Sequence, residues 1–229
     1  MANFQPKAID DFVYSKPSTK SLIKEILTQQ LDFPSNGKNS LMLYGIGGSG
    51  KTTFANFFFK QYEAMFGGET PLVESIDVDG DKDIFITLKH LNKLSSQVGF
   101  LNHSSKWYFL FDEFDGCTER QQRRLKSWLN SENIVCIMTT NYIDKIDKGI
   151  LRRCHIINFN ASNNTSDYVG RIQTMIANNN LPPLDTQTLI GIADRGKGDW
   201  TKMCVEVVRH CNRQMSSPTK PTTPKLRIV

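Results

Sequence analysis

The chain has 229 residues, a length typical of one domain or of one domain with a small annex. Hydrophobic residues make up 39% and charged residues 22% of it, a globular composition that excludes bulk disorder. The longest apolar runs fall far short of the roughly 20 residues that span a bilayer, and the amino terminus shows no secretory signal. Five cysteines without a C-x-x-C pair favour a reducing compartment. We therefore expect a cytoplasmic or nuclear protein without membrane attachment.

The net charge of +5 is unevenly placed. Residues 191–229 hold eight lysines and arginines against three acids, so the whole excess lies at this end of the chain. A second basic group, Arg120, Arg123, Arg124 and Lys126, recurs at helical spacing. Each group either screens the phosphates of a nucleic acid or forms a solvated surface, and both interpretations stay open.

Alternating helices and strands are predicted along residues 1–160. Helical spacing of apolar residues predicts helices at Ser21–Leu31, Thr52–Phe66, Ile84–Val98 and Thr118–Leu129. Short apolar runs predict strands at Leu41–Gly45, Pro71–Val78, Trp107–Asp112, Asn133–Asn141 and His155–Phe159. This alternation indicates an α/β fold, with a five-stranded, mainly parallel sheet and helices on both of its faces.

After Phe159 only helices are predicted. Apolar spacing places them at Tyr168–Asn178, Asp185–Ala193 and Trp200–Asn212. We expect a nucleotide-binding core at residues 1–160 and a small all-helical lid at 161–213. Three prolines and several basic residues then predict a flexible basic tail at 214–229.

Residues Gly45–Thr52 read GIGGSGKT and fit the phosphate-loop pattern G-x-x-x-x-G-K-[ST], between a predicted strand and a predicted helix. The glycines let backbone N–H groups turn inward, and the helix amino terminus adds partial positive charge. Lys51 is expected to reach the β- and γ-phosphates, and the Thr52 hydroxyl to ligate Mg²⁺. The predicted nucleotide-binding set is Gly45, Ile46, Gly47, Gly48, Ser49, Gly50, Lys51, Thr52 and Thr53.

Two acids stand at the carboxyl end of the predicted strand Trp107–Asp112. Asp112 is placed to hold the Mg²⁺ shell, and Glu113 to polarise an attacking water. An acid pair favours hydrolysis over mere storage of a nucleotide, although two acids can also cap the next helix. The following strand ends at Asn141, whose amide is expected to bind the γ-phosphate or the lytic water.

Arg152 and Arg153 precede the last predicted strand. An arginine here is expected to face a neighbouring subunit, where it would stabilise transition-state charge and make hydrolysis depend on assembly. Arg153 is the preferred candidate for this catalytic role, and an ordinary surface pair is the alternative.

Together these motifs resemble the AAA+ ATPases, and within them the clamp-loader branch, which includes replication factor C small subunits and the ATPase subunit of T-even phage clamp loaders. Phe4–Val13 is similar to the family's amino-terminal Tyr-Arg-Pro-Lys segment, which implies that Phe12 and Val13 lie beside adenine. Asp112–Asp115 matches the Walker B region, and Thr140–Ile146 the sensor 1 region. Arg152–Cys154 matches the Ser-Arg-Cys finger.

The sequence departs from the family at three points. Thr201 stands where the family has its sensor 2 arginine, which leaves Lys202 as the candidate substitute in nucleotide binding. Gln5 replaces an arginine. No residues remain for a collar domain, so we expect a ring to form through the ATPase modules or with a partner.

The resemblance implies a DNA-replication ATPase that uses ATP and Mg²⁺. Its subunits, alike or different, would form a ring or arc around primed or single-stranded DNA and act on a sliding clamp or a helicase, in a cell, a virus or a phage. DNA would then stimulate hydrolysis. Two alternatives stay open: a helicase loader or small viral-type replicative helicase, and a nucleotide-dependent assembly scaffold with little turnover.

Overall fold

A five-stranded parallel sheet forms the centre of the computed structural model, which describes residues 5–77, 89, 93, 102–160 and 164–216. The strand order is β2-β3-β4-β1-β5. The strands are β1 (Ser40–Tyr44), β2 (Val73–Asp77), β3 (Trp107–Asp112), β4 (Ile134–Thr140) and β5 (Cys154–Asn158). The predicted α/β fold is therefore confirmed, while the predicted helix Ile84–Val98, apart from residues 89 and 93, lies outside the described residues.

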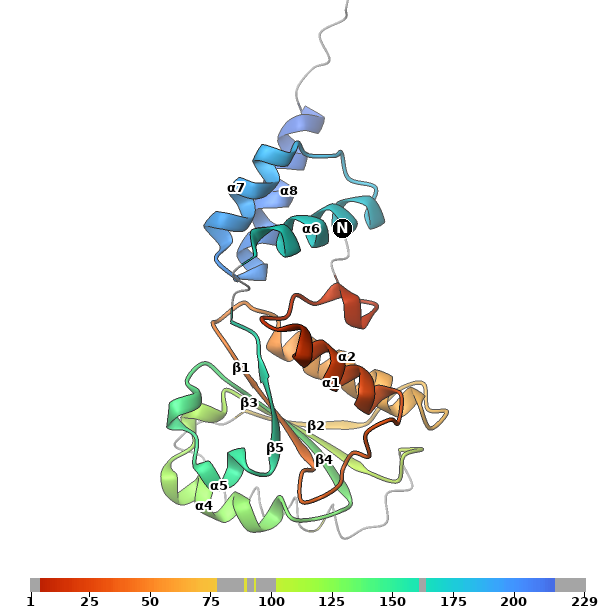
Figure 1. Cartoon of the computed structure of the whole chain (residues 1–229), viewed down its shortest axis with the longest axis vertical. Coiled ribbons are helices and arrows are strands. Elements are labelled where there is room, and N and C mark those ends of the chain that lie inside the picture. The colour runs from red at the N-terminus through yellow and green to blue at the C-terminus, as the bar shows by residue number, and fades with distance from the viewer. Residues whose placement is uncertain (1–4, 78–88, 90–92, 94–101, 161–163, 217–229) are drawn as a thin grey trace, which may run out of the picture.

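Helices cover both faces of this sheet (Figure 1). On one face lie α1 (Pro17–Leu27) and α2 (Lys51–Ala64), and on the other α4 (Glu119–Trp128) and the short α5 (Lys148–Leu151). Alternate residues of β3 serve the two layers, because side chains alternate across a strand. Tyr108 and Leu110 pack with α1 and α2, whereas Phe109 and Phe111 join the cluster around Trp128 of α4.

Local capping explains where the observed helices depart from the predicted ones. α1 begins at Pro17 rather than Ser21, because proline is well suited to the first turn of a helix, and it ends at Leu27. Thr118 lies before α4 as its cap and accepts a hydrogen bond from the Gln121 N–H.

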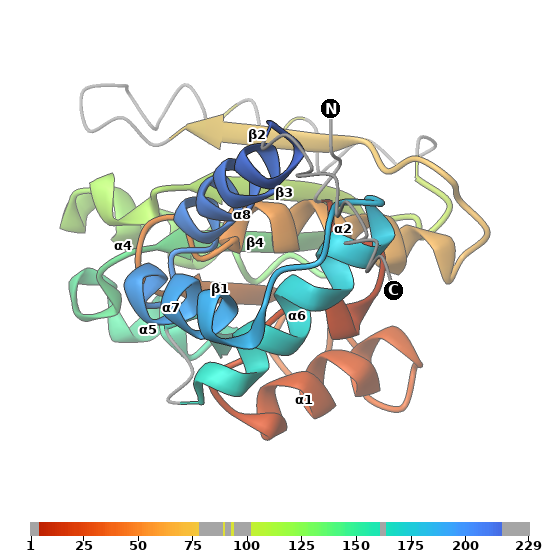
Figure 2. The ribbon, with the colours of Figure 1, turned by 90° about the horizontal axis from the view of Figure 1, so that it is seen from above.

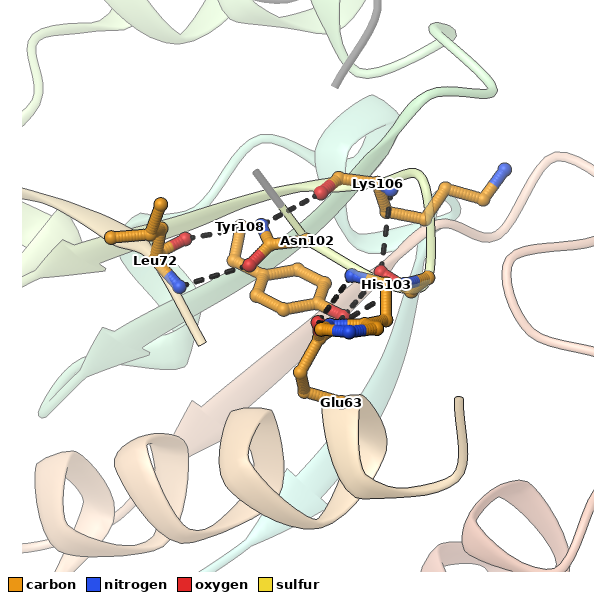
Figure 3. Close-up of polar contacts among 7 residues, drawn as sticks. Glu63, Leu72, Asn102, His103, Lys106 and Tyr108 are labelled. Carbon is orange, nitrogen blue, oxygen red and sulfur yellow. Dashed lines mark hydrogen bonds and ion pairs between the residues drawn. The ribbon is translucent and has the colours of Figure 1, made fainter. Parts of the chain in front are cut away.

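A network of polar contacts surrounds Glu63 at the carboxyl end of α2 (Figure 3). The buried Glu63 carboxylate accepts hydrogen bonds from the backbone N–H groups of His103 (2.5 Å) and Ser104 (3.5 Å) and from the Tyr108 hydroxyl. Asn102 extends the network, since it exchanges hydrogen bonds with the backbone of Leu72. The loop before β3 is thereby fixed to α2 and to the segment before β2.

Three helices form the lid, which packs around its own apolar cluster: α6 (Thr165–Asn178), α7 (Thr186–Gly196) and α8 (Trp200–Ser216). α6 starts three residues before its predicted start because Asn164 caps it. α8 continues to Ser216, so residues 214–216 of the predicted tail are helical. Among the described residues, no helix is long and apolar enough to cross a membrane.

The lid lies over the end of the sheet from which the phosphate loop emerges (Figures 1 and 2). The carbonyl of Gly48 accepts hydrogen bonds from the N–H groups of Trp200 (2.9 Å) and Thr201 (3.3 Å). The last helix of the lid therefore begins directly on the loop between β1 and α2.

Candidate functional site

The loop between β1 and α2 has the backbone conformation that its glycines predict. Gly48 and Gly50 have φ of 72° and 92°, in the left-handed region that favours glycine. A Cβ at Gly48 would also lie 2.2 Å from Oδ1 of Asp199 in the lid. The loop leads into α2, which starts at Lys51 and is preceded by Gly50 as its cap. This is the geometry in which backbone N–H groups and a helix amino terminus bind an anion.

Lys51 is buried at the base of the loop, with 8% of its surface exposed. Its ammonium group donates to the carbonyls of Gly45 (2.8 Å) and Ile46 (2.9 Å) and to Asn141 Oδ1 (2.8 Å). Burial lowers the pKa of Lys51, and the nearby charges of Asp112 and other acids oppose that shift. The site therefore brings together the predicted lysine and the predicted asparagine.

The predicted metal ligands also meet. The Thr52 hydroxyl lies 3.1 Å from each carboxylate oxygen of Asp112. Thr139, on the neighbouring strand β4, donates its hydroxyl hydrogen bond to Asp112 Oδ1. A hydroxyl and a carboxylate at one point are the oxygen ligands that Mg²⁺ prefers, so these residues fit the metal that the sequence implies.

Glu113 follows Asp112 in a left-handed conformation, with φ of 53°. Its N–H donates to the Thr139 hydroxyl at 3.1 Å, while its side chain is exposed. A non-glycine residue in this conformation stores backbone strain of about 1–3 kcal/mol, and such residues concentrate at functional sites. The exposed side chain of Glu113 is accessible to solvent or to a ligand.

Asn141 is held from two sides. Its Oδ1 receives the Lys51 ammonium, and its backbone N–H donates to Asp115 Oδ1 at 3.1 Å. Asp115 Oδ1 also accepts from the Thr140 hydroxyl at 2.8 Å. The acid after β3 thus fixes the end of β4.

A cavity of about 600 Å³ continues from the phosphate loop between the core and the lid. Phe12 and Val13 line it from the amino-terminal side, and Ser49 and Thr53 from the loop and α2. Lid residues including Tyr168, Trp200 and Thr201 close it. The predicted residues Phe12 and Val13 therefore lie where a group attached to a bound phosphate chain would extend.

Lys202 lies elsewhere. Its ammonium donates to the carbonyl of Arg195 at 3.0 Å, and it is not among the described residues that line the cavity. The contact of Trp200 and Thr201 with Gly48 explains this placement, because it fixes the start of α8 with Thr201 toward the cavity. The structure does not bring Lys202 to the phosphate loop.

Arg153 is held by its own chain near the ends of α4 and α5. Its Nε donates to Asn130 Oδ1 at 2.8 Å, and its Nη1 donates to the Gly149 carbonyl at 2.6 Å. Neither contact joins it to the phosphate loop. Arg152 beside it is exposed.

Sequence reasoning gave no functional role to three residues of this region: Thr139, Asp115 and Arg171. Thr139 and Asp115 lie close in sequence to the predicted site residues Asn141 and Glu113. Their positions near the carboxyl ends of β4 and β3 could therefore have indicated a role in the site. Arg171 carried no such signal, because its partner Asp11 is 160 residues away.

A parallel sheet, a glycine loop on a helix amino terminus and an acid at the carboxyl end of strand β3 define a P-loop nucleotide-binding protein. The family model described as "ATPase family associated with various cellular activities (AAA)" matches residues 41–162, more than half of the chain. The chain belongs to this family of ATPases, which bind ATP with Mg²⁺ and typically form oligomers.

Two solved structures illustrate the fold. PCH-2 from C. elegans has a TM-score of 0.55 at 11% identity, over 90% of this chain and 72% of that one. RuvB from Thermotoga maritima has a TM-score of 0.61 at 13% identity, over 92% of this chain and 64% of that one. The chain thus spans less than two thirds of RuvB. At such low identity these likenesses concern the fold alone. No curated protein matches the sequence.

Proposed function

We propose that this chain is an ATP-hydrolysing subunit of clamp-loader type that acts in DNA replication, with ATP sites shared between subunits. One observation carries the hydrolytic part: three parts of the sequence, Lys51–Thr52, Asp112 and Asn141, converge at one edge of the sheet. The clamp-loader part is supported by the motifs of the amino-terminal segment and of Arg152–Cys154.

In this proposal the phosphate loop binds the triphosphate, and Lys51 exchanges its carbonyl partners for β- and γ-phosphate oxygens. Thr52 and Asp112 hold Mg²⁺, which neutralises charge on the phosphates when bound. Glu113 and Asn141 orient a water molecule. As its oxygen bonds to the γ-phosphorus, the bond from phosphorus to the β–γ bridging oxygen breaks, giving ADP and phosphate. Catalysis then consists mainly of positioning and electrostatic stabilisation.

Arg153 supplies the group that completes the site of a neighbouring subunit. Its contacts with Asn130 and Gly149 orient the guanidinium on the side of the sheet covered by α4 and α5. An arginine contributed across an interface makes turnover depend on assembly. A ring or arc of like or unlike subunits is the arrangement that this role requires.

The exposed side of α4 is the proposed contact with DNA. Arg120, Arg123 and Arg124 line a hollow of about 450 Å³ together with Glu119. Glu119 pairs with Arg123 at 3.1 Å, and the lining of the hollow carries three guanidinium groups and one carboxylate. Such an excess of positive charge favours a phosphate backbone. Because α4 follows the Asp112–Glu113 pair closely in sequence, contact here provides a route from DNA to the hydrolytic site.

ATPase rates with and without a primer–template junction and a sliding clamp test this proposal. Stimulation by both supports clamp-loader action, and stimulation lost in Arg120→Glu/Arg123→Glu but kept in Lys24→Glu supports α4 as the contact. Lys24 is a matched control, since it is exposed on α1 across the sheet. Unwinding of a forked duplex would favour the helicase alternative. Equal turnover by wild type and Glu113→Gln would favour the scaffold.

A further inference from the structure

The cavity beyond the phosphate loop is closed on one side by residues 5–14, which we call the strap. The strap packs on the core through Phe12, whose ring centroid lies 5.1 Å from that of Phe54 and 5.2 Å from that of Phe57. Val13, the next residue, packs instead against the apolar cluster of the lid. The strap therefore bridges the two bodies that border the cavity (Figure 1).

Asp11 fixes the strap with one oxygen and binds the lid with the other. Its Oδ2 accepts from the backbone N–H groups of Lys7 (2.6 Å) and Ala8 (3.0 Å), which closes the turn before Phe12. Its Oδ1 accepts from Nη1 of Arg171 in α6 at 2.7 Å. Asp11 itself lines the cavity.

The pair is largely removed from solvent. The side chain of Arg171 is 8% exposed and that of Asp11 17%. Arg171 Nε is buried and has no hydrogen bond among the described residues, so Asp11 is the acid that compensates this guanidinium. Burial lowers the pKa of Arg171, and the negative charge of Asp11 opposes this shift. The buried guanidinium of Arg171 therefore favours the position of Asp11 in which the two groups pair, because any other position leaves the positive charge uncompensated.

We propose that Arg171 and Asp11 are positioning residues for the nucleoside half of the bound nucleotide. Their contact holds the strap against the lid, so that Phe12 and Val13 form one wall of the cavity for the base. The proposal rests on the proposed function, since it assumes that the phosphate loop binds a nucleoside triphosphate. It adds a residue, Arg171, that acts on nucleotide affinity through Asp11 rather than through direct contact.

Calorimetric titration with Mg²⁺–ATP and with Mg²⁺–tripolyphosphate separates this role from a general one, because tripolyphosphate lacks the base and ribose. Arg171→Met is expected to raise the Kd for ATP about tenfold. This is the change expected if the strap lies against the lid for only about a tenth of the time, because the apparent Kd rises as the binding-competent fraction falls. Its Kd for tripolyphosphate should stay within twofold of wild type. Asp11→Asn should give the same split, and it carries the test if Arg171→Met does not fold.

Arg195→Met is the matched control. Arg195 also pairs with a lid acid, Glu206 at 2.6 Å, but it contacts neither strap nor cavity among the described residues. An unchanged Kd for ATP in Arg171→Met or Asp11→Asn would overturn the inference. Equal weakening of ATP and tripolyphosphate would overturn it too, since this indicates general damage to the lid. A wild-type protein that binds neither ligand would instead refute the proposed function.

Discussion

The Lys51 ammonium and the Asn141 side chain lie 2.8 Å apart, although 90 residues separate them in sequence. The contact joins the phosphate loop, which follows β1, to the end of β4. The strands β1 and β4 pair directly in the sheet. A bound γ-phosphate would attract Lys51 and leave the Asn141 amide available to the phosphate or to water. Lys51 and Asp115 together fix the position of Asn141.

Asn141→Ala is expected to lower kcat for ATP hydrolysis about 100-fold, the usual effect of removing one donor to developing charge. The Kd for ATP should change little, because the phosphate loop and Lys51 remain. Single-turnover hydrolysis beside a binding titration measures both. Asn56→Ala, at an exposed site on α2, is the matched control and should behave as wild type. A kcat within twofold of wild type in Asn141→Ala would exclude this role.

Asp115 is expected to act on hydrolysis through Asn141. Asp115→Ala removes the acceptor for the Asn141 N–H and the Thr140 hydroxyl, and the resulting misplacement should lower kcat about tenfold. Asp115→Asn keeps an acceptor oxygen and should recover most of this loss. If Asp115→Asn is as slow as Asp115→Ala in a steady-state assay, positioning by hydrogen bonds is the wrong explanation.

Arg153→Ala should bind ATP normally and lose hydrolysis, because its guanidinium serves the neighbouring subunit. Glu113→Gln should also bind and not hydrolyse. Mixing the two proteins creates interfaces with an intact Glu113 and an intact Arg153, so part of the ATPase rate should return. If the mixture assembles, as measured by sedimentation, and no rate returns, the shared site is contradicted.

Glu63 is expected to stabilise the fold in a pH-dependent way. Although burial alone raises the pKa of Glu63, the hydrogen bonds from Tyr108, His103 and Ser104 hold it below the ordinary value of 4.5. Its contribution is therefore present above that value and is lost as pH falls through the lowered pKa. Glu63→Gln should cost about 1–3 kcal/mol at pH 7, because it turns an acceptor into a donor among donors.

Urea denaturation of wild type and Glu63→Gln at pH 7 and at about pH 3.5 measures this effect. The difference in free energy of unfolding should shrink at the lower pH. Glu25→Gln, at an exposed position on α1, should show little difference at either pH. A difference for Glu63→Gln that grows on acidification would contradict the assigned direction of the pKa.

The sheet and the phosphate loop were predictable because each depends on local sequence. Buried parallel strands such as Ile134–Thr140 are apolar over most of their length, and a glycine loop between a strand and a helix has few other uses. Helix ends were less predictable, since a proline in the first turn (Pro17) or a capping side chain (Asn164) competes with apolar spacing.

Contacts between distant segments were not predictable from one sequence. Thr201 and Lys202 are neighbours, and only the hydrogen bonds from the start of α8 to Gly48 decide that Thr201 lines the cavity while Lys202 reaches Arg195. The spacing of α6 likewise presents Arg171 as an ordinary helix residue. Its role depends on Asp11, which lies 160 residues earlier in the sequence and contacts Arg171 only in the folded chain.

Binding of Mg²⁺–ATP to wild type, Lys51→Ala and Lys60→Ala, followed by calorimetry, tests the central claim most directly. Lys60 is the matched control, because it is an exposed lysine on the same helix. We expect wild type and Lys60→Ala to bind alike, and Lys51→Ala to lose at least about 100-fold in affinity. The loss of charge-assisted contacts between Lys51 and the phosphates, worth about 3 kcal/mol, corresponds to such a change. Equal binding by all three proteins, or binding by none, would contradict a triphosphate site at Lys51.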